Sequence, residues 1–125
     1  MGDLTRHFSH YECECSCCKE MRTTMVFLNR MDMVRDLYAK PISPSSVYRC
    51  SNYNQQVAKS GLSGPHTSAA MDIPCVGEQA TELIKIALFM EFKGIGVYQS
   101  GDHHKRFIHL DDKERGMDYT TIWSN

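Results

Sequence analysis

The sequence has no apolar run that approaches the ~20 residues needed to cross a bilayer. Its longest apolar stretches, such as Ile86–Met90, are far shorter, so no membrane insertion is predicted. It also has no surplus of one charge, because 14 Lys and Arg face 15 Asp and Glu and leave a formal charge of -1. A chain without a cationic surplus is not expected to bind the phosphate backbone of nucleic acid.

The start of the chain lacks the apolar core of a secretion signal. Met1–His10 instead contains Asp3 and Arg6. We therefore expect cytoplasmic synthesis without a signal peptide. In a reducing compartment, the six cysteines are expected to be free thiols or metal ligands rather than disulfides.

Hydrophobic periodicity predicts two buried helices. Apolar residues recur at helical spacing over Thr24–Ala39 and again over Glu78–Phe92, where Gly94 is the expected stop. A shorter polar helical turn is predicted over Asn52–Ala58, after the prolines that end the first helix.

Three short runs predict strands. Ala69–Ile73 reads as one strand, and Ile95–Tyr98 with Phe107–Leu110 reads as a hairpin with a loose loop. The polar tail is expected to place Trp123 as a lid on the core. The mixed order of helices and strands predicts the α+β class, with residues 1–125 as a single domain whose small antiparallel sheet is flanked by helices.

Two short segments of the sequence each contain a histidine and an aspartate a few residues apart. His66 ends a Gly-Pro loop shortly before Asp72, and His109 lies on a later strand. Adjacent strands could bring these three residues together, and two imidazoles with one carboxylate form the ligand set of a catalytic zinc site with an open fourth position. The alternative is that His66 is an ordinary loop histidine and that Asp72 pairs locally.

The cysteines suggest a second metal site. Cys15 and Cys18 have the C-x-x-C spacing of half a structural zinc site, which Cys50 and Cys75 could complete if the fold brought them near. Otherwise these thiols are expected to be buried as small apolar groups.

Six motifs in a fixed order resemble those of zinc D-Ala-D-Ala carboxypeptidases, the peptidase family that shares its fold with the hedgehog signalling domain. The similarity is to the small version found in phage and bacterial cell-wall hydrolases. The motifs are Leu4–Phe8 with Glu12–Cys15, Tyr48–Cys50 with Tyr53–Val57, Ser63–His66 through Asp72–Ile73, Gly94–Tyr98, Phe107–Asp111, and Trp123.

The resemblance implies a hedgehog-like fold and a Zn²⁺ cofactor bound by His66, Asp72 and His109. Only five residues separate His66 from Asp72, whereas relatives usually have six. The loop could absorb the missing residue. If the strand kept its register instead, Asp72 would point to the opposite face, because strand side chains alternate.

Strand geometry and the resemblance together suggest roles around the metal. Asp111 lies two residues after His109 and shares its strand face, so it is the candidate general base or the group that orients His109. Its alternative is a solvent-facing aspartate. Arg49 is expected to contact a substrate carboxylate or the oxyanion, unless it forms an ordinary surface ion pair. Ser63 and Tyr98 are the candidate substrate contacts, with aromatic packing as the alternative for Tyr98.

Relatives often place an acidic base three residues before the late histidine, but this sequence has Arg106 there. Other candidates for proton transfer are Asp102, His103 and His104 in the loop before the strand. A solvated loop is their alternative.

The function implied is a peptidoglycan peptidase, either a DD-carboxypeptidase or an endopeptidase, that cleaves amide bonds of cell-wall stem peptides. A monomeric phage endolysin that reaches the wall after release from the host fits this picture. One alternative is a non-catalytic zinc-binding module that serves interaction or wall binding. Another is a metal-free structural domain of a virion.

Overall fold

The computed structural model describes residues 2–57 and 64–124. The elements, in chain order, are α1 His10–Cys13, α2 Met25–Tyr38, α3 Ser51–Val57, η2 Pro65–Thr67, β1 Ala70–Pro74, α4 Glu78–Phe89, β2 Gly94–Tyr98, η3 His103–Lys105, β3 Phe107–Asp111 and β4 Thr121–Ser124. This arrangement confirms the α+β class. Among the described residues, no helix has both the length and the apolarity to cross a membrane.

The strands form one sheet in the order β1-β3-β2-β4. β3 pairs antiparallel with both β1 and β2, as the predicted hairpin requires. β4 pairs parallel to β2, so the sheet is mixed rather than wholly antiparallel. The missed strand lies in the polar tail, which carries no clear alternating pattern.

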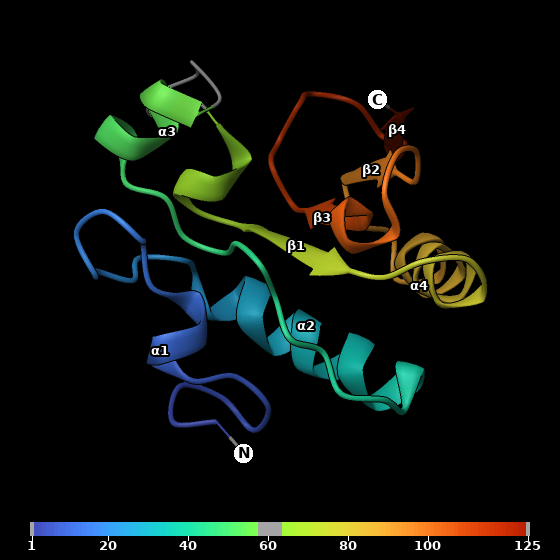
Figure 1. The fold of residues 1–125 in the computed structure, drawn as a ribbon, viewed down its shortest axis with the longest axis horizontal. Coiled ribbons are helices and arrows are strands. Elements are labelled where there is room, and N and C mark those ends of the chain that lie inside the picture. The colour runs from blue at the N-terminus through green and yellow to red at the C-terminus, as the bar shows by residue number, and fades with distance from the viewer. Residues whose placement is uncertain (1, 58–63, 125) are drawn as a thin grey trace.

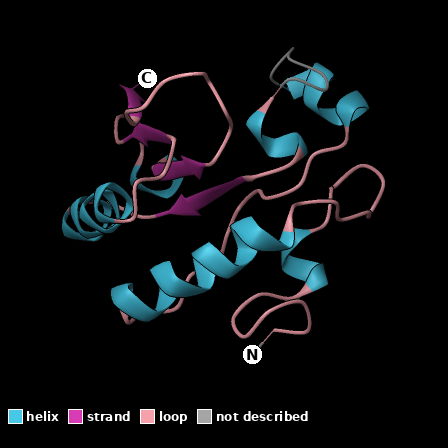
Figure 2. Cartoon of the chain, turned by 180° about the vertical axis from the view of Figure 1, so that it is seen from behind, coloured by secondary structure: helices cyan, strands magenta, loops and turns pink. Residues whose placement is uncertain are grey.

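The core lies between the sheet and two helices. α2 packs against α4, and α4 packs against β3, while Figures 1 and 2 show α2 running below the sheet. α2 begins where the Thr24 hydroxyl accepts a hydrogen bond from the Phe27 amide, and it ends at Ala39 in the left-handed region. The predicted first helix is thereby confirmed.

The second helix stops earlier than predicted. α4 ends with Met90 as its C-cap, and Glu91 follows with φ 60°. The Arg30 guanidinium donates to the Met90 carbonyl at 3.0 Å and satisfies one of the free acceptors at the end of α4. The expected stop residue, Gly94, is instead the first residue of β2.

Gly94 is required by its neighbour on β3. A Cβ at this position would lie 2.5 Å from Oδ2 of Asp111, which is paired with Gly94 across the strands. We expect Gly94→Ala to lower the free energy of unfolding by about 1–3 kcal/mol, because the Asp111 carboxylate is held by other partners and cannot move aside. Chemical denaturation measures this effect, and an unchanged midpoint would contradict the close approach.

Candidate metal centre

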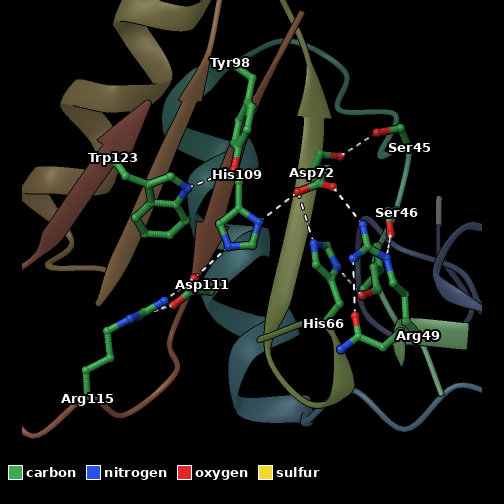
Figure 3. A network of polar contacts seen from close by, with 12 residues as sticks. Ser45, Ser46, Arg49, His66, Asp72, Tyr98, His109, Asp111, Arg115 and Trp123 are labelled. Carbon is green, nitrogen blue, oxygen red and sulfur yellow. Dashed lines mark hydrogen bonds and ion pairs between the residues drawn. The ribbon is translucent and has the colours of Figure 1, made fainter. Parts of the chain in front are cut away.

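Three buried side chains from separate elements meet at one point (Figure 3). His66 comes from η2, Asp72 from the middle of β1 and His109 from the middle of β3. Oδ1 of Asp72 lies 3.1 Å from Nε2 of His66 and 2.9 Å from Nδ1 of His109. The candidate ligand atoms all lie within 4.8 Å of one another.

The short spacing between His66 and Asp72 does not turn the aspartate away. Asp72 is the partner of His109 in the antiparallel register, and directly opposite residues point to the same face. The Gly64–Ala69 segment forms a tight turn before β1, in which the Ala69 amide donates to the Pro65 carbonyl at 3.0 Å. All three predicted ligands are therefore brought together.

Each imidazole is held by the nitrogen that faces away from the aspartate. Nδ1 of His66 lies 2.8 Å from the Val47 carbonyl, which can only accept a hydrogen bond, so this nitrogen carries the proton. Nε2 of His109 lies 2.6 Å from Oδ2 of Asp111. Outer partners of this kind orient histidine ligands of metal sites. Two nitrogens and one carboxylate oxygen aimed at a common point fit zinc.

Asp111 lies behind His109, on the opposite ring edge from the metal-facing nitrogen. Its fully buried carboxylate also accepts from Nη1 and Nη2 of Arg115, at 2.7 and 3.0 Å, and from the Lys113 amide at 3.0 Å. With its oxygens engaged this way, Asp111 is better suited to orient His109 than to act as a base. Sequence reasoning missed Arg115, although an Asp–Arg pair four residues apart was visible.

We expect Asp111→Asn to weaken zinc binding about 10- to 100-fold, because the outer hydrogen bond to a metal-binding histidine loses its charge. Competition with a chromophoric chelator measures this change. Asp112→Asn is the matched control, since Asp112 pairs with Arg30 instead of His109. Equal zinc affinity in the two variants would exclude the orienting role.

The carboxylates and imidazoles of the centre shift one another's pKa values toward the charged forms. Burial opposes ionisation of Asp72, but hydrogen bonds with His109 and His66 lower its pKa below the ordinary value. Burial is likewise outweighed at Asp111, where His109 and Arg115 lower the pKa to about 2. At His109 burial disfavours the charged ring, yet the bonds to Asp111 and Asp72 raise its pKa. Without metal, His109 is thus stabilised as the imidazolium.

This raised pKa predicts how the stability of the metal-free protein depends on pH. The contribution of His109 to the free energy of unfolding is fully present below its ordinary pKa of 6.5 and is lost as the pH rises through the raised folded-state pKa. Denaturation of the chelator-treated protein across this range measures the loss. His109→Asn should remove this component of the pH dependence, and an identical profile in both proteins would contradict it.

Arg49 reaches the centre from the segment that runs beside β1. The Ser45 amide donates to the Asp72 carbonyl and the Asp72 amide donates to the Ser46 carbonyl, both at 2.9 Å. This pairing places Nη2 of Arg49 3.5 Å from Oδ2 of Asp72. Nε of Arg49 donates to Oγ of Ser46 at 3.2 Å. The guanidinium is therefore oriented beside the metal ligands and is not a surface ion pair.

A cavity of about 240 Å³ opens over the ligands. Its aromatic wall is ordered: Tyr98 stacks on Phe107 with ring centroids 4.5 Å apart, and Nε1 of Trp123 donates to the Tyr98 hydroxyl at 2.9 Å. The Trp123 ring lies 5.3 Å from that of His109. Trp123 is thus a wall of this cavity, not the lid on the core that the sequence predicted.

A second cavity, of about 350 Å³, shares Arg49, Asp72 and Phe107 with the first and extends to Glu12 and Glu14. Arg49 therefore lines both cavities, which lie on two sides of its side chain. Adjoining cavities of this kind can hold different parts of one extended ligand.

The remaining candidates lie elsewhere. Asp102, His103 and His104 are exposed in the loop between β2 and β3, and Arg106 donates to the Gly101 carbonyl. The side chains that line the cavity over the metal ligands are those of Arg49, Pro65, His66, Asp72, Tyr98, Phe107, His109 and Trp123. Ser63, a predicted substrate contact, lies outside the described residues.

Comparison with known proteins agrees with this geometry. A family model described as Peptidase M15 matches residues 6–111, which include all three candidate ligands. No curated protein and no solved structure gives a match.

Proposed function

Because the chain belongs to the peptidase M15 family and is thus a zinc metallopeptidase, we propose that it hydrolyses amide bonds in the stem peptides of peptidoglycan. The observation that carries the proposal is the convergence of two histidines and one aspartate beneath an open cavity, with an arginine at its edge. The action is that of a DD-carboxypeptidase or an endopeptidase. We place it at the cell wall, after release of a monomer from the cell that makes it.

The metal ligands in this proposal are Nε2 of His66, Oδ1 of Asp72 and Nδ1 of His109. When bound, zinc polarises the scissile carbonyl and lowers the pKa of a water molecule. The chain supplies the orientation of these ligands. The Val47 carbonyl keeps the proton of His66 on Nδ1, and the Asp111 carboxylate accepts a hydrogen bond from the protonated Nε2 of His109.

Arg49 is proposed to bind the substrate. Its guanidinium lies at the junction of the two cavities and can donate two parallel hydrogen bonds to a terminal carboxylate or to the oxyanion that develops at the scissile carbonyl. The Tyr98 ring, which stacks on Phe107, lines the other wall and is proposed to contact the peptide. Ser63 remains a proposed contact from the resemblance.

The test is hydrolysis by the zinc-loaded full chain. Purified peptidoglycan and a synthetic stem pentapeptide are incubated with the protein, and the products are separated by mass spectrometry. Release of D-alanine identifies a DD-carboxypeptidase, whereas new amino groups without free D-alanine identify an endopeptidase. His109→Ala serves as the inactive control.

One observation favours a second candidate, a non-catalytic zinc-binding module. Arg106 occupies the place of the acidic base of relatives, and among the described residues that line the cavity over the ligands Asp72 is the only acidic one. Absence of turnover on both substrates under every metal condition, with zinc bound at the centre, would support this module and reject the peptidoglycan proposal.

A further inference from the structure

Three cysteine thiols from two separate segments of the chain gather outside the peptidase centre. Cys15 and Cys18 belong to the loop between α1 and α2, and Cys50 directly precedes α3. Their sulfur atoms all lie within 4.8 Å of one another. The fold thus brings Cys50, one of the two predicted partners, to the C-x-x-C pair.

Cys75, the other predicted partner, is not in this group. Cys75 is buried in the core and its thiol donates to the Ile73 carbonyl at 3.3 Å. Burial raises the pKa of Cys75 to about 11, and that of Cys13 to about 12. These two thiols are neutral packing groups, which separates them chemically from the cluster.

The cluster, in contrast, is surrounded by hydrogen-bond donors. The Cys50 amide donates to the sulfur of Cys15, and the Tyr53 amide donates to the sulfur of Cys50, both at 3.4 Å. Burial would raise the pKa of Cys15, but the Cys50 amide and those of the Cys17–Cys18 turn lower it to about 7. Amides that point at a sulfur stabilise its thiolate, which is the form that binds metals.

The loop that carries Cys15 and Cys18 folds into a tight turn around the Cys15 sulfur. The Lys19 amide donates to the Cys15 carbonyl at 2.9 Å, and the Cys15 amide donates to the Glu20 carbonyl at 2.8 Å. Lys19 has φ 63°, a left-handed conformation that a side chain disfavours. Cys17 and Cys18 are exposed, so apolar burial does not hold this end of the turn.

We propose that Cys15, Cys18 and Cys50 form a second metal site, which binds zinc structurally and is separate from the peptidase centre. Thiolates are the ligands of structural zinc sites, which are closed by four protein groups. The structure places three of the four thiols together, and we assign the fourth position to Cys17, whose exposed side chain lies in the same turn as Cys15 and Cys18. Binding releases the remaining thiol protons to solvent, so the affinity of this site increases with pH.

This metal would fasten the N-terminal loop to the wall of the active site. Cys50 directly follows Arg49, whose amide donates to the His66 carbonyl at 2.8 Å. The Tyr48 amide donates to the Cys13 carbonyl at 3.1 Å on the same segment. The proposed zinc therefore sits at the base of the segment that presents Arg49 and holds His66 in place.

The experiment uses cobalt as the probe, because thiolate ligands give Co²⁺ an intense sulfur-to-metal charge-transfer band and nitrogen or oxygen ligands do not. The reduced full chain is titrated with Co²⁺ and its spectrum and metal content are measured. We expect the band in the wild type and in His109→Ala, which loses metal only from the peptidase centre. Cys18→Ser should lose the band while it keeps metal at the peptidase centre.

Two further variants make the result specific. Cys18 is exposed, so its substitution does not disturb the core. The first further variant, Cys75→Ser, is the matched control, because it removes a thiol outside the cluster and should keep the full band. Cys17→Ser should weaken the band, and an unchanged band would remove Cys17 from the ligand set.

The proposal is overturned if the reduced wild type fills its peptidase centre without a charge-transfer band. It is overturned equally if the band survives in both Cys15→Ser and Cys18→Ser. A disulfide in place of the metal site is the remaining rival. Thiol titration of the denatured protein without reductant would then find fewer than the six thiols of the sequence.

Discussion

Replacement of His109 by alanine is expected to reduce peptide hydrolysis roughly 10³-fold or more in kcat/KM, because a metal ion supplies several kcal/mol of transition-state stabilisation and each 1.4 kcal/mol is about a factor of ten. The His109 ring is fixed between Asp72 and Asp111. Its loss also leaves the Asp111 carboxylate without one of its partners. Hydrolysis of the stem pentapeptide and the zinc content of the same preparation measure both effects.

His7→Ala is a matched control for this variant. His7 forms a surface pair with Asp36, and such pairs contribute little to stability. This control should retain wild-type kcat/KM. Retention of more than about a tenth of the activity in His109→Ala would show that the metal does not supply the expected stabilisation.

Arg49→Ala is expected to lower kcat about 10²- to 10³-fold if the guanidinium stabilises the oxyanion, because the removal of one such donor has this effect in other hydrolases. If Arg49 instead binds a carboxylate equally in the ground and transition states, KM rises and kcat is unchanged. Arg49→Lys should recover part of the loss, since it keeps the charge without the planar pair of donors. Steady-state kinetics on the pentapeptide separate these cases.

The zinc content of Arg49→Ala shows whether Arg49 affects metal binding or only the substrate. Arg49 contacts Asp72 through Oδ2, whereas Oδ1 faces the histidines, so Arg49→Ala should still bind zinc at the peptidase centre. Arg6→Ala, which removes an exposed arginine that pairs with Asp36, is the control for the loss of a positive charge. Unchanged kcat and KM in Arg49→Ala would remove this residue from the substrate site.

Much of the fold was predictable because its helices and central strands have regular apolar patterns. α2 and the β2–β3 hairpin depend on local periodicity and agree with the structure. β4 was not predictable, because its side chains alternate only between partly buried and exposed and its parallel partner is distant in sequence. The role of Gly94 also depends on a tertiary neighbour, the carboxylate of Asp111.

The metal-facing residues could be predicted because each is a chemically distinctive side chain in a recognisable motif. Their supporting groups could not. The Val47 carbonyl that fixes His66 is a backbone atom, and a backbone atom has no signature in the sequence. Both Cys50 and Cys75 were predicted to complete the C-x-x-C pair, and only Cys50 joins it, because sequence spacing alone does not show which thiol is buried in the core and which lies at the loop.

The three candidate metal ligands differ in how firmly the backbone segments that carry them are held. β3 is hydrogen-bonded on both edges, and Asp72 of β1 is hydrogen-bonded to the Ser45–Ser46 segment on the edge away from β3, so His109 and Asp72 move only when the sheet opens. His66, in contrast, is carried by the three-residue turn η2. Short turns open locally with far smaller free energies than central strands. We therefore expect departure of the ion to a chelator to begin with detachment of His66, so that its residence time reports the opening rate of that turn while the remainder of the domain stays folded.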